Sequence, residues 1–488
     1  MTSRQSRSSR APGLRVALRR AMVPLIAATL GGAALAALPA QVAGAATRTT
    51  LWVSSTGTDA ANNCTVKTSP CKTISHALTF VAPTGSNINV VTGSGPIVDQ
   101  ATISHSDVTI NGNGASIAPV TDNVNGSTPS GADVRAVVSV TSGFTNVLLK
   151  NLTIDGTGMP AAAGCVAGPG HTGLYVRSAS VTLSKVNVTS ITSGAPNLLG
   201  CQNGLAVYVR SQSGPSATLK MSGGKVDNYQ KNGITCNDTG TTCKISLTEV
   251  VGRGPVGLGD AAQNGIQFGF GGGGTINKAK VHGNNYTPDG EGTGILLYDT
   301  ASNASVISSE VFANNVGIYA QNDSGNSTAS VTLKSNNAHD AAPATNGFNG
   351  DGIFLDSVSN ATVISNTVKT NGDGGIIGYG AKLSTIKSNH LSAANGTGIG
   401  LAGPGSVNAT STSNLVTMNT VDGSTADGIQ ATADATGNAF SNNTMSNNQP
   451  FDAHDSSSGG GTAGTANNWS GNACHNGGGG GSPAGICS

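Results

Sequence analysis

The chain has 488 residues and is close to neutral, with 25 Lys and Arg against 24 Asp and Glu, and only 10% of its residues are charged. Nucleic-acid binding requires a concentrated basic surface, so this composition excludes a nucleic acid as partner. Glycine is abundant, with 70 residues, but Val, Ile and Thr alternate with polar residues along most of the chain. This alternation is typical of β-strands separated by glycine turns and argues against a disordered protein.

The first 45 residues have the features of a secretory signal peptide. An arginine-rich segment is followed by the apolar run Met22–Leu38 and by Ala43–Ala45, a small-x-small cleavage sequence. An uncleaved membrane anchor is the alternative, but the run contains Pro24 and is barely long enough to span a bilayer. We therefore expect a secreted, extracellular or wall-associated protein with no membrane span in its mature part. Without the six leader arginines, 19 basic residues face 24 acidic ones, a net charge near −5.

Residues 46–110 are expected to form an N-terminal helical cap and the first coils of a repeat structure. Leu51–Val53 is predicted as a short strand, and Ser69–Val81 carries apolar residues at helical spacing after helix-start signals. Asn87–Val91 and Val108–Ile110 are the next predicted strands. A helix at this end would cover the apolar interior of the first coil, which a stacked repeat otherwise exposes.

A repeated pair, glycine followed by leucine or isoleucine, marks the middle of the chain. The ten glycines of these pairs are Gly173, Gly204, Gly233, Gly265, Gly294, Gly317, Gly352, Gly375, Gly398 and Gly428. The steps between them are 31, 29, 32, 29, 23, 35, 23, 23 and 30 residues. Coils of one circumference that carry loops of variable length would give a minimum step of 23 residues with irregular additions. Such periods are typical of a solenoid.

Each repeat contains short alternating runs. In one repeat these are Gly352–Leu355, Ala361–Ile364 and Asn366–Val368. Because each strand residue advances about 3.3 Å, three strands per repeat fit a three-faced coil, and the sequence predicts an all-β, single-stranded parallel β-helix. A β-propeller, which needs about 40 residues per blade, is the nearest alternative. We assign the coils to residues 111–450 and a glycine-rich C-terminal tail or cap to residues 451–488.

Asparagine also recurs at a constant phase of the repeat. Asn366, Asn389 and Asn414 form one such series. Asparagine tolerates turn conformations, and its side-chain amide can hydrogen-bond to the same residue of the next coil. We therefore expect stacked asparagine ladders between neighbouring coils.

These repeats resemble a known family. The sequence GIFLDSVSNATVISNTVKTNGDGGIIGYGAKLSTIKSNHL, residues 352–391, is similar to the right-handed parallel β-helix repeat of pectate-lyase-like and NosD-type proteins. LWVSSTGTDAANNCTVKTSPCKTISHAL, residues 51–78, resembles the N-terminal cap of exported bacterial members, and GGGTAGTANNWSGNAC resembles the terminal segment of uncharacterised secreted ones. The resemblance covers about residues 51–488 and implies a right-handed coil. It does not imply one activity, because the fold hosts lyases, hydrolases, epimerases and adhesins.

All eight cysteines lie in the part expected to be exported, where an even number is typical of disulfides. Proximity in the sequence favours three local pairs and leaves a fourth pair about one repeat apart. The four pairs are Cys64 with Cys71, Cys236 with Cys243, Cys474 with Cys487, and Cys165 with Cys201. Eight cysteines allow 105 pairings, so this connectivity is a hypothesis. Zinc ligation is the alternative, but the chain has no Cys-x-x-Cys.

The catalytic signatures of two polysaccharide-degrading classes are missing from the sequence. Of the polygalacturonase-type motifs only a Gly-His-Thr-Gly, Gly170–Gly173, comes close, and the pectate-lyase-type arginine motif is absent. Phe451–Asp455 faintly resembles the Asp-Pro-His-Glu segment of mannuronan epimerases. Its proline is replaced and it lies in the terminal tail, so a chance match is favoured.

The repeated pair predicts which side chains point outward. The residue after each glycine is apolar and points inward, so the residues two and four positions after the glycine point outward. The fourth position includes Arg177, Tyr208, Tyr298, Asp356 and Tyr379, and the second includes Tyr175, Gln267, Tyr319 and Phe354. Rings stack on apolar sugar faces and planar polar groups bind hydroxyls, so this face is a candidate polysaccharide site. The substrate-binding candidates are Arg177, Tyr208, Gln267 and Tyr319. Strand propensity of tyrosine, or packing of the tyrosines beneath the inserted loops, is the simpler explanation of the same pattern.

Two loops, residues 284–293 and 337–351, lengthen particular coils and could wall a groove. They and their flanks bring His282, Asp289, Glu291, His339, Asp340 and Asp351. Surface loops often carry function, although simple tolerated insertions are the favoured explanation.

We expect a monomeric β-helix protein that engages extracellular or cell-wall polysaccharide. Whether it is an enzyme stays open from the sequence. In a polyuronate lyase, the best enzyme hypothesis, Tyr298 or Tyr379 would act as acid or base, and Asp299 or Asp356 would bind Ca²⁺. A glycoside hydrolase would need paired carboxylates instead. The alternative is a non-catalytic structural or adhesive surface protein, which the missing signatures favour slightly.

Overall fold

The computed structural model describes residues 48–166, 168–211, 214–257, 259–287, 292–300, 303–325, 330–342, 350–475 and 479–488. The expected signal peptide, residues 1–45, lies outside these residues, as do Asp289 and Glu291. Within the described ranges, no helix is both long enough and apolar enough to cross a membrane.

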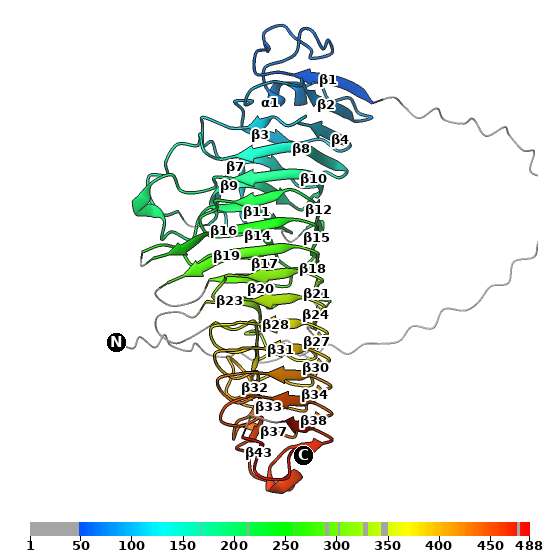
Figure 1. Ribbon diagram of the computed structural model, residues 1–488. Helices are drawn as coiled ribbons and strands as arrows, with labels where there is room; N and C mark the ends of the chain where they lie inside the picture. Colours follow the sequence, from blue (N-terminus) through cyan, green and yellow to red (C-terminus); the bar gives the residue numbers. More distant parts are fainter. Residues whose placement is uncertain are drawn as a thin grey trace, which may run out of the picture. The chain divides into compact units, whose positions relative to one another are not determined.

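Parallel strands stack coil upon coil from β1 to β43 (Figure 1). Sheet A contains 26 strands, of which a typical coil contributes two. These are β1 (Thr49–Val53), β2 (Ser86–Val90), β4 (Val108–Asn111), β5 (Ser116–Ile117), β8 (Val147–Asp155), β10 (Ser180–Thr189), β12 (Ala217–Ser222), β13 (Lys225–Asp227), β15 (Thr241–Ser246), β16 (Glu249–Val256), β18 (Gly273–Asn277), β19 (Lys280–Tyr286), β21 (Ala304–Ile307), β22 (Glu310–Phe312), β24 (Val331–Lys334), β25 (Asn337–His339), β27 (Thr362–Ile364), β28 (Thr367–Lys369), β30 (Thr385–Lys387), β31 (His390–Ser392), β34 (Leu415–Thr417), β35 (Thr420–Asp422), β38 (Ala439–Ser441), β39 (Thr444–Ser446), β41 (Asn468–Ser470) and β42 (Ala473–His475).

Sheet B contains 15 strands and takes one from a typical coil. These are β3 (Ala101–Ile103), β6 (Gly126–Ser127), β7 (Asp133–Val140), β9 (Gly170–Arg177), β11 (Leu205–Arg210), β14 (Asn232–Asn237), β17 (Asn264–Gly269), β20 (Thr293–Tyr298), β23 (Val316–Gln321), β26 (Ile353–Asp356), β29 (Ile376–Tyr379), β32 (Ile399–Ala402), β36 (Ile429–Ala431), β40 (Ala453–Asp455) and β43 (Gly481–Ser482). A further pair is formed by β33 (Ser411–Thr412) and β37 (Ala435–Thr436), and two short 3-10 turns occupy Pro196–Leu198 and Thr462–Gly464.

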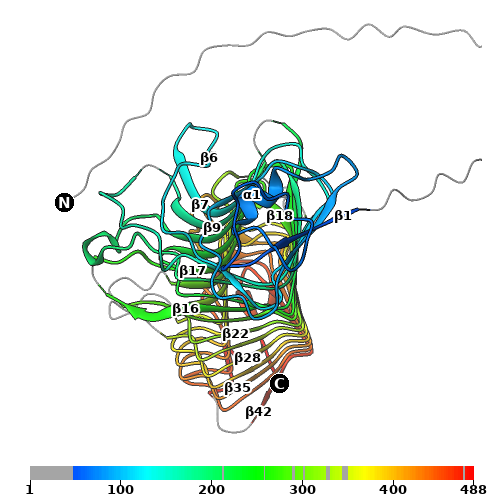
Figure 2. The ribbon, with the colours of Figure 1, turned by 90° about the horizontal axis from the view of Figure 1, so that it is seen from above.

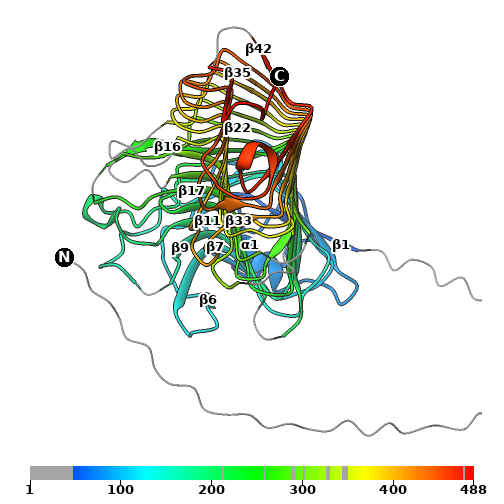
Figure 3. The ribbon, with the colours of Figure 1, turned by 90° about the horizontal axis from the view of Figure 1, so that it is seen from below.

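One repeat shows how the coils are built. Strands β26, β27 and β28 are followed 23 residues later by β29, β30 and β31, with Ile353 beside Ile376 and Val363 beside Ile386. These strands coincide with the three runs expected from the sequence. Views along the stack show the outlines of successive coils nested on one another (Figures 2 and 3). The predicted parallel β-helix is confirmed.

The Gly-Leu/Ile pair has two physical causes. The isoleucine is core: Ile353 and Ile376 are fully buried. The glycine lies where two coils meet, because a Cβ added to Gly375 would lie 2.5 Å from the carbonyl oxygen of Gly398 and 2.6 Å from a Leu391 methyl group. A side chain at this position therefore has no room, which explains why the pair recurs.

We expect Gly375→Ala to destabilise the fold by about 3 kcal/mol, because the next coil must move away from the added methyl group. Chemical denaturation monitored by circular dichroism measures this cost. Gly460→Ala is the matched control, since a Cβ there would meet nothing within 4 Å. Equal denaturation midpoints for the two variants would contradict the steric explanation.

Buried asparagines link the coils as ladders. The longest runs through Asn336, Asn366, Asn389, Asn419, Asn443 and Asn472, and each member donates its backbone and side-chain N–H groups to the side-chain oxygen of the next. The expected series is wrong in its third member, because Asn414 belongs to a second ladder with Asn438. The cause is the longer coil after Gly398, which shifts the phase of the sequence.

The N-terminal helix is shorter than expected. Helix α1 (Ile74–Leu78) replaces the predicted Ser69–Val81, and the Thr73 side chain accepts a hydrogen bond from the His76 backbone at its start. The residues before it are held differently: Cys71 is bonded to Cys64 and pairs with β1 through Val53. The chain therefore cannot begin its helix before this bridge.

All four expected disulfides are present. They join Cys64 to Cys71, Cys165 to Cys201, Cys236 to Cys243, and Cys474 to Cys487. These bonds are compatible with a location in an oxidising compartment.

Candidate functional site

Sheet B presents two rows of outward side chains. Row 1, from the middle of the strands, contains Tyr175, Tyr208, Thr235, Gln267, Leu296, Tyr319, Phe354, Ile377, Gly400, Gln430 and His454. Row 2, two residues further along each strand, contains Arg177, Arg210, Asn237, Gly269, Tyr298, Gln321, Asp356, Tyr379 and Ala402.

The sequence placed Tyr208 in the row of Arg177, and this register is wrong. Tyr208 pairs with Tyr175, and Arg210 pairs with Arg177. The reason is that the pair at Gly204 lies two residues earlier in the register than its neighbours, since Val207, and not Leu205, pairs with Leu174 and Ile234. Counting from this glycine therefore gives a false position.

The rows are covered near the N-terminal end of sheet B. The hairpin of β6 and β7 brings Ser127 over row 1 and row 2. The hydroxyl of Tyr175 donates to the Ser127 carbonyl at 2.7 Å, and Arg177 donates to the Ser127 hydroxyl at 3.0 Å. Tyr208 is only 6% exposed. Tyr208 thus presents little free surface, whereas Arg177 is half-buried and, with Ser127 and Tyr175, lines a smaller cavity of about 190 Å³.

Gln267 is held in a network of amides. Its oxygen accepts hydrogen bonds from Asn232 at 2.9 Å and Asn264 at 3.3 Å, and its nitrogen donates to Asn237 at 3.2 Å. Because both ends of the amide have partners, this side chain is a structural link between coils before any ligand arrives.

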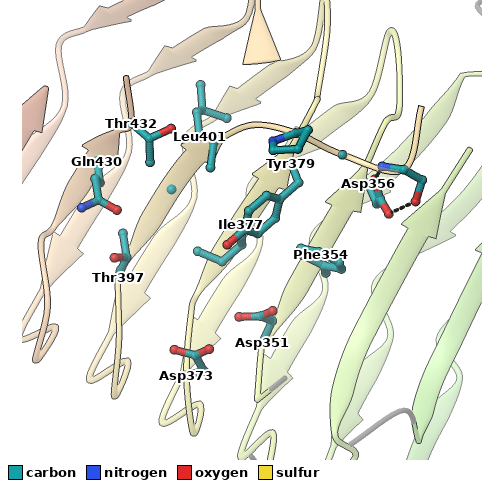
Figure 4. A pocket seen from close by; sticks show the side chains of 15 residues that line it. Asp351, Phe354, Asp356, Asp373, Ile377, Tyr379, Thr397, Leu401, Gln430 and Thr432 are labelled. Carbon is teal, nitrogen blue, oxygen red and sulfur yellow. Dashed lines mark hydrogen bonds between the residues drawn. The ribbon is translucent and has the colours of Figure 1, made fainter. Parts of the chain in front are cut away.

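Further along the sheet the rows border a cavity of about 420 Å³ (Figure 4). Phe354 and Ile377 of row 1 and Asp356 and Tyr379 of row 2 line it, and the segment 404–406 forms its rim. Two of the four catalytic candidates, Asp356 and Tyr379, therefore meet in one cavity.

Two further carboxyl groups, Asp351 and Asp373, lie side by side in this cavity (Figure 4). Asp351 precedes β26 and is 6% exposed, and its Oδ1 accepts a hydrogen bond from the Gly374 N–H at 2.9 Å. Burial and the nearby charge of Asp373 raise the pKa of Asp351 to about 7, and burial also raises the pKa of Asp373. Such a pair can hold one proton near neutral pH, an acid beside a base.

Tyr379 shares the electrostatic field of these carboxyls. Burial and the charges of Asp351 and Asp373 raise the pKa of its hydroxyl, so this group stays protonated at neutral pH. The ring itself is 39% exposed. Tyr379 can therefore offer a flat face and a hydroxyl donor to a ligand.

Asp356 anchors the rim of the cavity. One carboxylate oxygen accepts hydrogen bonds from the Ser406 N–H at 2.7 Å and the Ser357 hydroxyl at 3.0 Å, and the other accepts one from the Ser406 hydroxyl. Both oxygens thus hold the segment 404–406 in place. Asp356 therefore has little capacity left to bind the expected Ca²⁺ ion.

A second cavity of about 420 Å³ continues along the same face. Tyr298, Tyr319 and Gln321 line it, and Phe354 lines both cavities. The ring of Phe354 lies 5.0 Å from that of Tyr319 and 5.6 Å from that of Tyr379, measured between centroids. Aromatic side chains from adjacent coils therefore connect the two cavities.

The expected cation ligand Asp299 lies outside both cavities, where its carboxylate accepts a hydrogen bond from the Ser324 N–H at 2.8 Å. In the described part of the chain, one group of three metal-type ligands lies close together, Cys64, Cys71 and His76, and both cysteines are in a disulfide. Within the first cavity only Asp351 and Asp373 retain free carboxylate oxygens, whereas Ca²⁺ takes about six to eight oxygen ligands.

The sequence pattern predicts Asp351 in a loop and contains no prediction for Asp373. A signal for both exists, because Asn-Gly-Asp-Gly occurs twice, at residues 349–352 and 371–374. The repetition places an aspartate at the start of sheet B in two successive coils.

The family model for the right handed beta helix region matches residues 172–391 and 294–482. The chain belongs to this right-handed β-helix family. No curated protein sequence matches the chain. Among solved structures, it is similar to the periplasmic alginate epimerase AlgG, at 10% identity over 81% of this chain and 78% of that chain with a TM-score of 0.44.

The chain is also similar to the A-module of the Azotobacter vinelandii mannuronan C-5 epimerase AlgE4, at 14% identity over 74% of this chain and 86% of that chain with a TM-score of 0.44. For pectate lyase Pel9A, the identity is 14% over 83% of this chain and 80% of that chain, with a TM-score of 0.37. Similarities at this level carry no conclusion about activity.

Proposed function

We propose that this β-helix protein binds a polysaccharide along rows 1 and 2 of sheet B and hydrolyses glycosidic bonds in the first cavity. The observation that carries the proposal is the pair Asp351 and Asp373, with the pKa of the buried Asp351 raised to about 7. Glycoside hydrolysis uses one carboxyl group as proton donor and a second as nucleophile or base. The pair comes from neighbouring coils and is offset by one residue, because Asp351 is in register with Gly374. We assign the second carboxyl group the role of nucleophile, as in retaining enzymes.

The environments of the two carboxyls suggest their roles. Asp351, the more buried group, would carry the proton and deliver it to the glycosidic oxygen as the bond breaks. Asp373, which is more open to solvent, would attack the anomeric carbon and form a glycosyl ester. A water molecule would then hydrolyse this ester, with Asp351 now acting as base.

The charges of the cavity favour a neutral polysaccharide. Asp351, Asp356 and Asp373 line it, and its lining residues include no Lys or Arg. The carboxylate of a uronate would meet charges of its own sign here, which costs binding energy. A neutral glycan is therefore a better substrate for this cavity than the polyuronate considered from the sequence.

The aromatic side chains supply the binding surface. Tyr319, Phe354 and Tyr379 follow one another across three coils at ring separations that allow contact. Sugar rings present C–H groups that pack on such faces, so a chain of several sugars can lie along the groove.

Incubation with neutral and uronate polysaccharides tests the proposal. We expect new reducing ends from at least one neutral glycan and no absorbance of unsaturated products. Tyr379→Ala should weaken retention of that glycan about tenfold in affinity electrophoresis, because it removes one stacking ring, worth about 1.4 kcal/mol.

Phe312→Ala is the matched control, since its ring stacks between His282 and His339 on sheet A. Equal loss of retention in both variants would overturn the binding face. Retention without any product would instead identify a non-catalytic adhesive protein, and unsaturated products would identify a lyase.

A further inference from the structure

A serine, a histidine and an aspartate meet at the C-terminal end of sheet B. The Nδ1 atom of His454 lies 2.6 Å from Oδ2 of Asp427, and the Oγ atom of Ser456 lies 3.2 Å from Nε2 of His454. These are the hydrogen bonds of a nucleophile, its base and the acid that orients the base. The hydrolysis proposed above uses none of the three groups.

Strand geometry explains why these side chains meet. Ala453 and Asp455 of β40 point inward and are buried, so His454 and Ser456 lie on the same outward side, two residues apart. Asp427 comes from the preceding coil, just before β36. The arrangement is not visible in the sequence, because Asp427 and Ser456 are about one coil apart.

The hydrogen bonds fix the proton positions. A carboxylate can only accept, so Nδ1 of His454 carries the proton that is shared with Asp427. In the neutral imidazole, Nε2 is then a lone-pair acceptor, and the hydroxyl of Ser456 donates to it. This is the tautomer in which a histidine can remove a proton from serine.

Further hydrogen bonds hold residues of the array and their neighbours in place. Asp427, which is 4% exposed, also accepts hydrogen bonds from the Phe451 N–H at 3.2 Å and from Gln430 at 2.9 Å. The inward Asp455 accepts from the Trp469 indole at 2.7 Å and from the Ser457 N–H at 2.9 Å. These contacts hold Asp427 and the residue before Ser456 in place, and the Ser456 N–H donates to the Ala431 carbonyl at 2.9 Å.

The array lies next to the first cavity. Gln430 and Thr432 line that cavity, and Gln430 pairs with His454 in the next coil. Thr432 follows Ala431, which pairs with Asp455, so Thr432 lies beside Ser456. A ligand that extends along the cavity therefore reaches Ser456 at its end.

We propose that Ser456 is the nucleophile of an acyl-ester hydrolase site, with His454 as its base and Asp427 as the group that orients His454. The substrate class is an O-acyl ester of a sugar hydroxyl, such as an acetyl ester. That the ester is carried by a polysaccharide lying in the adjacent cavity rests on the function proposed above.

The reaction balances with water as the only co-reactant. Oγ of Ser456 bonds to the ester carbonyl carbon as its proton passes to Nε2 of His454. The bond from that carbon to the sugar oxygen breaks, and the sugar hydroxyl leaves with the proton. Water then attacks the acyl-serine, gives its proton to His454 in turn, and releases the carboxylic acid with Ser456 restored.

Thr432 is the donor that the geometry assigns to the developing oxyanion. Its hydroxyl is buried and, among the described residues, has no hydrogen-bond partner. Buried polar groups are rarely left unsatisfied, so such a group needs an explanation. In the proposed reaction, this hydroxyl turns about the Cα–Cβ bond of Thr432 and donates to the oxygen of a carbonyl group bonded to Ser456.

Covalent labelling tests the nucleophile without any polysaccharide. We expect a fluorophosphonate to label the full protein at Ser456, found by mass spectrometry, and p-nitrophenyl acetate to be hydrolysed. Ser456→Ala should abolish labelling and lower kcat/KM by about 10³-fold or more, and Asp427→Asn should lower kcat by about 10²–10⁴-fold. Ser458→Ala, a change at an exposed neighbour, should leave both readouts unchanged.

The outcomes separate this proposal from the glycosidase. Absence of label at Ser456, or labelling that persists in Ser456→Ala, overturns the esterase. If the label forms but neither glycan retention nor new reducing ends appear, the esterase stands and the glycosidase fails. Release of acetate from an acetylated glycan by wild type and not by Ser456→Ala supports both the chemistry and the substrate class.

Discussion

Asp351→Asn is expected to abolish glycan cleavage and at the same time to make the protein more stable above neutral pH. The asparagine keeps the shape of the side chain and can still accept the hydrogen bond from the Gly374 N–H. It cannot donate a proton to a leaving oxygen. General acid catalysis contributes about 10²–10⁴-fold to such reactions, so the rate of reducing-end release should fall by this factor.

The stability gain follows from the raised pKa of Asp351. An aspartate in the unfolded chain has a pKa of about 3.9, whereas burial holds that of Asp351 at about 7. Below about pH 4 the carboxyl is protonated in both states, and its contribution to stability is complete. Between about pH 4 and pH 7 only the folded state keeps the proton, so wild-type stability falls as pH rises. The total loss is about 4 kcal/mol.

Urea denaturation at pH 4 and pH 8 measures this difference. Asp351→Asn and wild type should unfold at similar urea concentrations at pH 4, and the variant should unfold at a higher concentration at pH 8. The same change at an exposed aspartate, Asp434→Asn, should leave the pH dependence unaltered. A variant that keeps its activity, or one that is less stable than wild type at pH 8, would contradict the role of Asp351 as a buried acid.

The sequence was sufficient to predict the coil because its cause is local. An inward isoleucine and a glycine without room for a Cβ recur along the middle of the chain, and the pattern of Ile353 and Ile376 is visible without coordinates. The register was lost where the coil length changes. Tyr208 follows a glycine that lies two residues early in the register between strands, and Asn414 follows the loop of the longest C-terminal coil.

The candidate site was only half visible in the sequence. Outward positions on one strand follow from alternation, so Phe354 and Tyr379 were found. The partners that decide chemistry come from other coils and from turns: Asp373 joins Asp351, and Asp427 joins His454. The sequence of one strand also does not show which of its side chains another segment covers. Ser127, which contacts Arg177, comes from a hairpin in an earlier coil. Pairwise geometry between coils is what the sequence pattern lacks.

Asn389→Ala is expected to cause a large loss of stability and to split the unfolding transition. Asn389 accepts two hydrogen bonds from Asn366 at 2.9 Å and donates to Val363 and Asn419 at 3.0 Å. Alanine would leave these buried partners without it, at a cost of about 1–3 kcal/mol for each unsatisfied group and about 4 kcal/mol or more in total.

The split of the unfolding transition follows from the position of Asn389 within the stack of coils. Coils contact only their neighbours, so the stability of a solenoid is roughly a sum of coil and interface energies. A weakened interface at Asn389 should let the coils on its C-terminal side unfold at lower denaturant than those on its N-terminal side. Hydrogen exchange would place the early opening after β31.

Two matched variants separate hydrogen bonding from packing. Asn389→Leu restores apolar volume without the four hydrogen bonds, and we expect it to be as unstable as the alanine variant. Asn395→Ala removes an exposed asparagine whose amide makes two longer contacts, donating to the Gly372 carbonyl at 3.3 Å and accepting from the Thr425 hydroxyl at 3.5 Å, and should cost less than about 1 kcal/mol. If leucine restores wild-type stability, the asparagine side chains stabilise the fold only by their packing in the core. If it does not, coils are joined by amide hydrogen bonds that no apolar side chain replaces.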